Sequence, residues 1–248
     1  DRVNIKGTKS SGGKIDDVYG SLYTNNTVDG NAVTEGNYTH AAGTLDTEAI
    51  AKTETLLRMY YAFQFTLPGI TWIYYGDDIG MSGVMQYTLA TGSTSTTSSA
   101  SHEARIYRQP MKWSGTVEGS TYNCKYPIGF NNYTMTWDAL NMQLDGVAEQ
   151  GADDKSILNA YKSLIKIRKE NPVLARGKVI NRYTTGGVIC YSVTNGDDEI
   201  LVYVNAGTDD RGAVCNYAVP DGAQLLYGDG MIGANRVPAL SMLIYKVG

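Results

Sequence analysis

Two adjacent carboxylates, Asp77 and Asp78, are the first residues in the chain whose type and position are suited to chemistry. They follow Ile70–Tyr75, an uncharged run of β-branched and aromatic residues that is typical of a strand buried on both faces. Gly76 allows the backbone to turn sharply between the two. Because active sites lie at the carboxyl ends of parallel strands, this pair is a candidate for acid–base chemistry or for orienting other polar groups. The alternative is an ordinary core strand with its glycine turn.

A second candidate group is the segment RQPMKW, residues 108–113. Arg108 offers a fork of donors for vicinal hydroxyls or carboxylates, and Trp113 offers a flat apolar face for a pyranose ring. Structural roles compete with this interpretation. Arg108 can instead pair with Asp77 or Asp78, and Trp113 can fill the core of a loop. The sequence leaves both alternatives open.

Two predicted helices must position these groups. The pattern predicts a helix over Asp46–Thr66, because apolar residues recur at helical spacing and Asp46 can cap its start. Pro68-Gly69 ends it, so a short turn leads from this helix into the predicted strand, as in the αβ half of a barrel unit. Asp153–Glu170 is the second helix, with acids at its start, basic residues at its end and Asn171-Pro172 after it.

After Arg176 the residue pattern changes to that of short strands separated by turns such as Asn195-Gly196. This pattern predicts an antiparallel β-sandwich with strands at Lys178–Tyr183, Val188–Thr194, Glu199–Asn205, Ala213–Val219, Gln224–Tyr227 and Ser241–Val247.

Three segments together resemble the α-amylase family of glycoside hydrolases (family 13). Residues 67–83, LPGITWIYYGDDIGMSG, resemble the family's eighth barrel strand, PGxPxIYYGDEIGM, with Thr71 in place of Pro and Asp78 in place of Glu. Residues 108–113 resemble its RxPMxW segment, and the helix at 153–170 resembles its last barrel helix, DPxSLLNxYxxLIxLRKENPxL. At the start of the chain, Arg2 matches the last residue of the family's NHDxxR motif.

The resemblance implies the C-terminal part of a (β/α)8 TIM barrel followed by a β-sandwich domain. A complete barrel needs about 250 residues, whereas only residues 1–176 precede the predicted β domain. We therefore expect two domains, the C-terminal part of a catalytic barrel at 1–176 and the β-sandwich at 177–248.

The function that this resemblance implies is retaining hydrolysis of α-1,4-linked glucans such as starch and maltooligosaccharides by a longer parent enzyme. A retaining mechanism needs a nucleophile and an acid/base on other barrel strands. We therefore assign no catalytic residue to this chain and expect the chain alone to be inactive. The expected partners are the α-glucan substrate and the missing N-terminal half of the barrel, or an oligomeric partner. The residues expected to contact or support bound glucan are Arg2, Tyr75, Asp77, Arg108 and Trp113.

Two other functions remain open for this chain. One is a non-catalytic glucan-binding or structural fragment, and the other is an inactive amylase-like subunit, as in the amino-acid transporter heavy chains. Sequence upstream of Asp1 discriminates between an enzyme and a mimic, because it either carries or lacks the family's acids.

Composition excludes other classes. A net charge of −4 over 248 residues, with no basic block, argues against nucleic acid as a partner. No uncharged run reaches the roughly 18 residues that a membrane span needs. The three cysteines, Cys124, Cys190 and Cys215, lack zinc spacing, and a pairing of Cys190 with Cys215 is allowed but not established.

No cofactor is identifiable from the residues, although the resemblance allows a structural calcium ion in the parent enzyme. The 19 tyrosines and 28 glycines, with few lysines, are typical of secreted polysaccharide-degrading enzymes. We expect an extracellular or cell-surface location.

Overall fold

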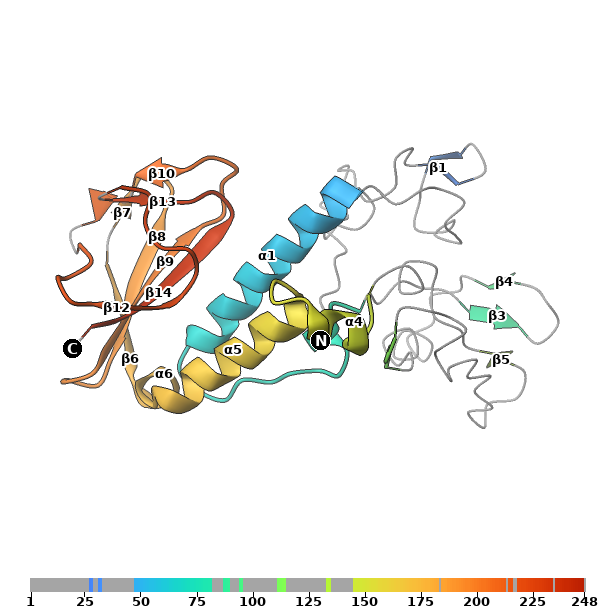
Figure 1. Cartoon of the computed structure of the whole chain (residues 1–248), viewed down its shortest axis with the longest axis horizontal. Helices are drawn as coiled ribbons and strands as arrows, with labels where there is room; N and C mark the ends of the chain where they lie inside the picture. Colours follow the sequence, from blue (N-terminus) through green and yellow to red (C-terminus); the bar gives the residue numbers. More distant parts are fainter. Residues whose placement is uncertain are drawn as a thin grey trace. The chain divides into compact units, whose positions relative to one another are not determined.

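The structure is a computed structural model of the whole chain (Figure 1). It describes residues 27–28, 31–32, 47–81, 87–89, 94–95, 111–114, 133–134, 145–182, 184–212, 214–215, 218–233 and 235–247.

The chain divides into two compact units. Unit 1 comprises Asp1–Thr53 and Ile73–Leu158, and unit 2 comprises Glu54–Trp72 and Asn159–Gly248. The domain boundary between residues 176 and 177 that the sequence indicates stays a prediction.

Both predicted helices are present. Helix α1 spans Thr47–Thr66, and helix α5 spans Ile157–Glu170, four residues later than the acidic stretch at Asp153 indicated. Asp153 instead holds a turn, in which its carboxylate accepts the Lys155 N–H at 2.9 Å and its carbonyl accepts the Ser156 N–H at 3.0 Å. A short helix, α6 (Val173–Arg176), follows Pro172.

Aromatic rings join α1 to α5 inside unit 2, where the two helices run side by side (Figure 1). The ring of Tyr161 lies between two residues of α1, with centroid distances of 4.4 Å to Tyr61 and 5.5 Å to Phe65. All three side chains are buried, so this contact is the apolar seam between the helices.

A five-stranded antiparallel sheet forms the rest of unit 2, in the order β12-β14-β9-β8-β6. All five strands match the sequence prediction to within two residues at each end, and β9, β12 and β14 match it at both ends. The strands are β6 (Lys178–Asn181), β8 (Ile189–Thr194), β9 (Glu199–Asn205), β12 (Gln224–Tyr227) and β14 (Ser241–Val247).

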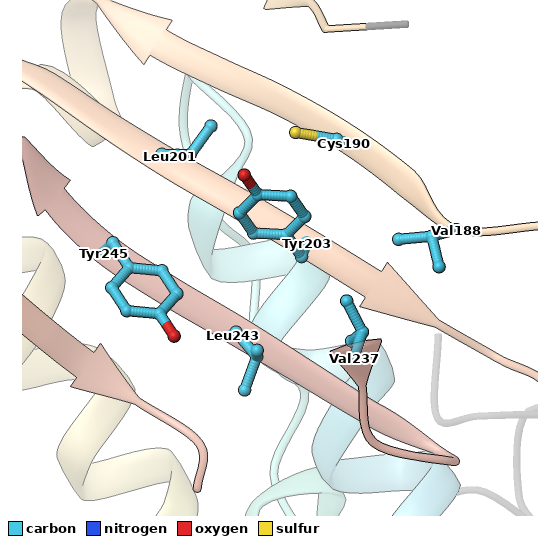
Figure 2. Packing of buried hydrophobic residues seen from close by; sticks show 7 residues of the cluster. All are labelled: Val188, Cys190, Leu201, Tyr203, Val237, Leu243 and Tyr245. Carbon is cyan, nitrogen blue, oxygen red and sulfur yellow. The ribbon is translucent and has the colours of Figure 1, made fainter. Parts of the chain in front are cut away.

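Both faces of the central strands are buried. On one face lies an apolar cluster (Figure 2). It consists of alternate residues of β9 and β14 (Leu201, Tyr203, Leu243 and Tyr245), Cys190 of β8, Val188 just before β8, and Val237. The opposite face carries Tyr191, whose ring meets Phe63 of α1 edge-on at 5.9 Å. Tyr191 also shares a hydrogen bond of 2.5 Å between its hydroxyl and Thr66 Oγ1. Helix α1 thus covers one face of the sheet.

Short strand pairs accompany this sheet. β10 (Arg211–Gly212) pairs with β13 (Arg236–Val237), and β11 (Val214–Cys215) pairs with β7 (Thr184–Thr185). The sequence did not predict β7, β10 or β13, and it predicted β11 as part of a longer strand. The antiparallel character is confirmed, whereas the two-sheet sandwich stays a prediction. Cys190 is buried and takes part in no disulfide, so the pairing with Cys215 that the sequence allowed is not formed.

Unit 1 has fewer described elements. They are β1 (Thr27–Val28) paired with β2 (Asn31–Ala32), the sheet of β4 (Thr94–Ser95), β3 (Tyr87–Leu89) and β5 (Tyr133–Thr134), the 3-10 helix η2 (Asp77–Ile79) and helix α4 (Val147–Ala152).

The buried strand predicted at Ile70–Tyr75 is wrong. Residues 70–74 have no regular secondary structure, and no described strand pairs with them. The side chains of Ile70 and Trp72 are 85% and 81% exposed. The composition of a segment shows what it could bury, but burial needs neighbouring strands and helices, and the described residues supply none here.

Tyr191 gives the first testable prediction, because burial raises its pKa to about 12, against the lowering effect of its Thr66 hydrogen bond. A folded-state pKa above the unfolded value means that the fold holds this proton more tightly. The resulting stability is complete below pH 10 and is lost as the pH rises toward 12, by up to about 2 to 3 kcal/mol. Tyr191→Phe should remove this alkaline loss and cost about 1 kcal/mol at neutral pH through the missing hydrogen bond.

Urea unfolding at several pH values checks this, with Tyr60→Phe on the exposed side of α1 as the matched control. An alkaline loss of stability that is the same in Tyr191→Phe and in the parent chain would contradict it.

Candidate functional site

The acidic pair lies in a tight turn bracketed by two glycines. Gly76 and Gly80 have φ values of 89° and 67°, which lie in the left-handed region that favours glycine. Between them η2 forms, and the Met81 N–H donates to the Gly76 carbonyl at 2.8 Å, which closes the turn. The two glycines therefore allow this turn. The sequence analysis predicted a turn from Gly76 alone.

The two carboxylates have different surroundings within this turn. Asp77 is only 7% exposed, and its Oδ2 accepts the Tyr74 N–H at 3.3 Å. Asp78 is half-buried, and its Oδ1 accepts the Gly76 N–H at 3.0 Å. Each carboxylate thus binds backbone that precedes it, and together they fix the conformation of residues 74–80.

Tyr75 lies directly before the turn and is partly exposed to solvent. The residue is 42% exposed, and its ring packs against that of Tyr74 with centroids 4.9 Å apart and planes tilted by 34°. An aromatic ring that is supported on one side and open on the other suits stacking against an apolar sugar face.

Residues 111–114 form the second part of the site, and they cap α4. The carbonyls of Lys112 and Trp113 accept the N–H groups of Val147 and Ala148, each at 3.0 Å. The first N–H groups of a helix have no acceptor within the helix, so residues 112 and 113 supply the acceptors that the start of α4 lacks. Gly146 is required here, because a Cβ at that position would lie 2.8 Å from the backbone of Ser114.

This capping leaves the Trp113 side chain outside the packed core. Trp113 is 51% exposed, so the alternative in which it fills a loop core does not hold. Lys112, its neighbour, is instead buried at 1% exposure.

An apolar cluster inside unit 1 joins the two motifs. Ile79 and Met81 from the acidic turn pack with Leu158, and Met111 from the RQPMKW segment packs against them, as does Val147. The sequence therefore brings both predicted site segments onto one small core.

Gln150 connects the same elements by hydrogen bonds, and sequence reasoning missed it. Its Nε2 donates to the carbonyls of Ile79 at 2.8 Å and Asp145 at 3.0 Å, while its Oε1 accepts the Leu158 N–H at 3.2 Å. The side chain is buried, so it supplies partners that water cannot. A glutamine in a six-residue helix carries no local signal of such a role.

Three of the five predicted site residues, Tyr75, Asp77 and Trp113, can thus be placed. Arg2 and Arg108 lie outside the described residues, so the pairing of Arg108 with Asp77 or Asp78 stays a prediction. Among the residues that the structure describes, no group of three or more His, Cys, Asp or Glu side chains is suited to hold a metal ion.

The comparisons with known proteins agree with the motifs that form this site. The sequence model of the alpha amylase catalytic domain matches residues 33–177, which include α1, the acidic turn, the Trp113 segment and α5. The chain belongs to the α-amylase family.

Curated members of this family include Alpha-amylase 3 of Dictyoglomus thermophilum, which is 29% identical to this chain over 143 residues. Alpha-amylase SusG of Bacteroides thetaiotaomicron is 26% identical over 167 residues, and a 4-alpha-glucanotransferase of Thermotoga maritima is 27% identical over 127 residues. These alignments cover 56%, 64% and 50% of this chain, but only 23%, 20% and 23% of the relatives. The chain therefore corresponds to less than a quarter of each relative's length.

Solved structures show the same fold. The trehalulose synthase MutB from Pseudomonas mesoacidophila MX-45 superposes with a TM-score of 0.56 at 20% identity, over 79% of this chain and 38% of that one. An alpha-amylase from H. orenii superposes with a TM-score of 0.55 at 21% identity, over 81% of this chain and 37% of that one. The match of the family model to residues 33–177 confirms the family resemblance. No helix in the described part of the chain is long and apolar enough to cross a membrane.

Gln150 gives the second prediction. Gln150→Glu replaces the Nε2 donor by a carboxylate that faces the carbonyl oxygens of Ile79 and Asp145, so the free energy of unfolding should fall by about 2 to 4 kcal/mol at neutral pH. Part of this loss should be recovered in acid, where the introduced carboxyl is protonated and donates again.

Urea unfolding followed by circular dichroism measures this. The matched control is Asp154→Asn, an exchange of similar shape at an exposed position, which should change stability by no more than about 0.5 kcal/mol. Equal effects of the two substitutions would show that Gln150 does not join these elements.

Proposed function

We propose that this chain is the C-terminal portion of an α-amylase-type glycoside hydrolase that acts on α-1,4-linked glucans by a retaining mechanism. The observation that carries the proposal is the match of the catalytic-domain model to 33–177 in a chain that covers about a fifth to a quarter of its relatives. The acidic turn and the Trp113 segment, which pack on one core, are the features of this portion that suit a sugar site.

The carboxylates of the described turn have a supporting role in this proposal. A retaining glycosidase needs two carboxyl groups about 5 Å apart on either side of the scissile bond, and one of them must reach the anomeric carbon. Asp77 is buried and engaged with the backbone of its own turn. It therefore acts by holding Tyr75 and neighbouring groups in place, and the nucleophile and the acid/base come from other strands of the parent enzyme.

Exposed aromatic rings supply the contact with substrate. Tyr75 and Trp113 both present open ring surface, and pyranose rings stack on such surfaces through their apolar faces. Arg2 and Arg108 bind hydroxyl groups in this proposal, because a guanidinium donates in a planar fork.

The remainder of the catalytic barrel is the proposed partner of this chain. Ile70, Trp72 and Ile73 are exposed and uncharged, and no described strand pairs with their backbone. Parallel barrel strands on both sides would satisfy these backbone groups and cover the side chains. The location that we propose for the parent enzyme is extracellular or cell-surface, on the basis of composition.

The third prediction is that the chain 1–248, purified alone, releases no reducing sugar from starch or maltoheptaose, because the two flanking carboxylates are on strands that it lacks. The longer natural polypeptide that includes the whole catalytic domain should hydrolyse both. Turnover above a blank by the chain alone would refute the assignment. A longer form that binds maltoheptaose without hydrolysing it would identify an inactive amylase-like subunit instead.

The fourth prediction concerns Trp113 in that longer form. Trp113→Ala should raise the KM for maltoheptaose by about five- to tenfold, which corresponds to about 1 kcal/mol of lost stacking, with a smaller change in kcat. Tyr60→Ala, which removes an exposed ring from α1, is the matched control and should leave KM unchanged. Equal KM values for Trp113→Ala and the parent would remove Trp113 from the substrate site.

A further inference from the structure

The turn between β8 and β9 carries the only Asn-Gly pair in the sequence, Asn195-Gly196. The two strands pair up to Thr194, which lies opposite Glu199, so residues 195–198 make the whole connection (Figure 1). These four residues are all exposed. Gly196 has a φ of 112°, and a Cβ built on it would meet no atom within 4 Å. Water therefore reaches both the side chain of Asn195 and the N–H group that follows it.

The side chain of an asparagine can react with the backbone nitrogen of the next residue. That nitrogen loses its proton and bonds to the side-chain carbon Cγ, the bond from Cγ to Nδ2 breaks, and ammonia leaves a five-membered cyclic imide. Water then opens the imide at either carbonyl, which gives aspartate or isoaspartate. The overall reaction consumes only water, and its products are a carboxylate and an ammonium ion. A following glycine favours the attack because no side chain blocks the approach.

Two hydrogen bonds of the turn suit this reaction. The Gly196 N–H donates to Thr194 Oγ1 at 3.3 Å, so an acceptor lies beside the proton that must leave. The Asp198 N–H donates to Asn195 Oδ1 at 3.3 Å, which polarises the carbonyl under attack and stabilises the charge that develops on its oxygen. The leaving nitrogen, Nδ2 of Asn195, has no hydrogen bond to any residue that the structure describes. It can therefore leave directly into solvent.

Two other asparagines of the same unit lack these conditions. Asn171 is buried, and Pro172 after it has no N–H that could become the nucleophile. Asn205 is fully buried, and its Nδ2 donates to three backbone carbonyls, which hold the nitrogen that would have to leave. The fold thus protects these two side chains and leaves Asn195 open.

We propose that Asn195 is a site of spontaneous deamidation and isoaspartate formation in the folded protein. The two products differ in their effect on the sheet. An aspartate carboxylate can still accept the Asp198 N–H, so the turn keeps its shape. An isoaspartate runs the backbone through the side-chain carbon and lengthens the turn, which disturbs the pairing of Thr194 with Glu199. Formation of isoaspartate therefore loosens the junction of β8 with the buried strand β9.

The first experiment incubates the chain 1–248 and follows deamidation by peptide mass spectrometry. Trypsin releases residues 183–211 as one peptide, which contains Asn195 and also Asn205 as an internal control. Asn195 should convert at least about tenfold faster than Asn205 in the folded chain. The rate should rise about tenfold per pH unit, because the nucleophile is the deprotonated nitrogen.

The same incubation in urea shows whether the folded turn leaves Asn195 open. The rate at Asn195 in the folded chain should lie within about fivefold of the rate in the unfolded chain. A folded chain that is slower by more than this would overturn the proposal. Asn195→Gln is the control variant and should stay unmodified at this position, because its longer side chain would have to close a six-membered ring.

Two further variants test the turn itself. Thr194→Val removes the acceptor of the Gly196 N–H and should slow deamidation about threefold or more, whereas Thr194→Ser should match the parent chain. A rate in Thr194→Val equal to that of the parent would overturn the role of this hydroxyl.

Hydrogen exchange tests the consequence for the sheet. The isoaspartate-containing fraction of an aged sample should exchange at least about tenfold faster near the turn, in β8 and β9, while Asn195→Asp should match the fresh parent chain. An isoaspartate-containing fraction that exchanges like Asn195→Asp would overturn the disturbed pairing.

Discussion

The burial of strand β9 on both faces is the constraint on which the best-defined part of this protein depends. Residues 200–205 are all buried, so apolar layers must lie above and below the sheet. One layer is the cluster around Tyr203 and Leu243, and the other includes Phe63 of α1 through its contact with Tyr191. Each large apolar side chain removed from water contributes about 1.5 to 3 kcal/mol. The sheet is therefore the anchor that holds the end of α1 in place, and the corner at Pro68 starts from that anchor.

The extent to which the sequence predicted this fold follows from how local each signal is. β9 and β14 were predicted at both ends, because alternating β-branched residues between turn residues specify a strand without reference to its partners. The start of α5 was placed four residues early, because Asp153 is equally suited to cap a helix and to hold the turn that it makes with Lys155. The apolar run at Ile70 was misjudged because composition does not say which neighbours are present.

The same distinction applies to the candidate site. The segments with Tyr75, Asp77 and Trp113 were identified from their residue types, and the structure packs both segments on the core of Ile79 and Met81. Their roles differ in ways that only burial reveals, since adjacent aspartates have identical chemistry and different exposure. The hydrogen bonds of Gln150 and Arg168 could not be predicted, because the carbonyls that they reach, those of Ile79 and Phe65, are far away in sequence.

The exposed segment from Ile70 to Ile73 has a consequence for the life of the polypeptide in the cell. A short, uncharged, β-branched and aromatic stretch with which no described strand pairs is the kind of sequence that self-associates in cross-β fashion. It contains no lysine or proline that would act as a gatekeeper. Any form of this polypeptide in which the segment stays uncovered is therefore a target for chaperones and proteases. Covering these four residues is accordingly a condition for the protein's abundance as well as for its architecture.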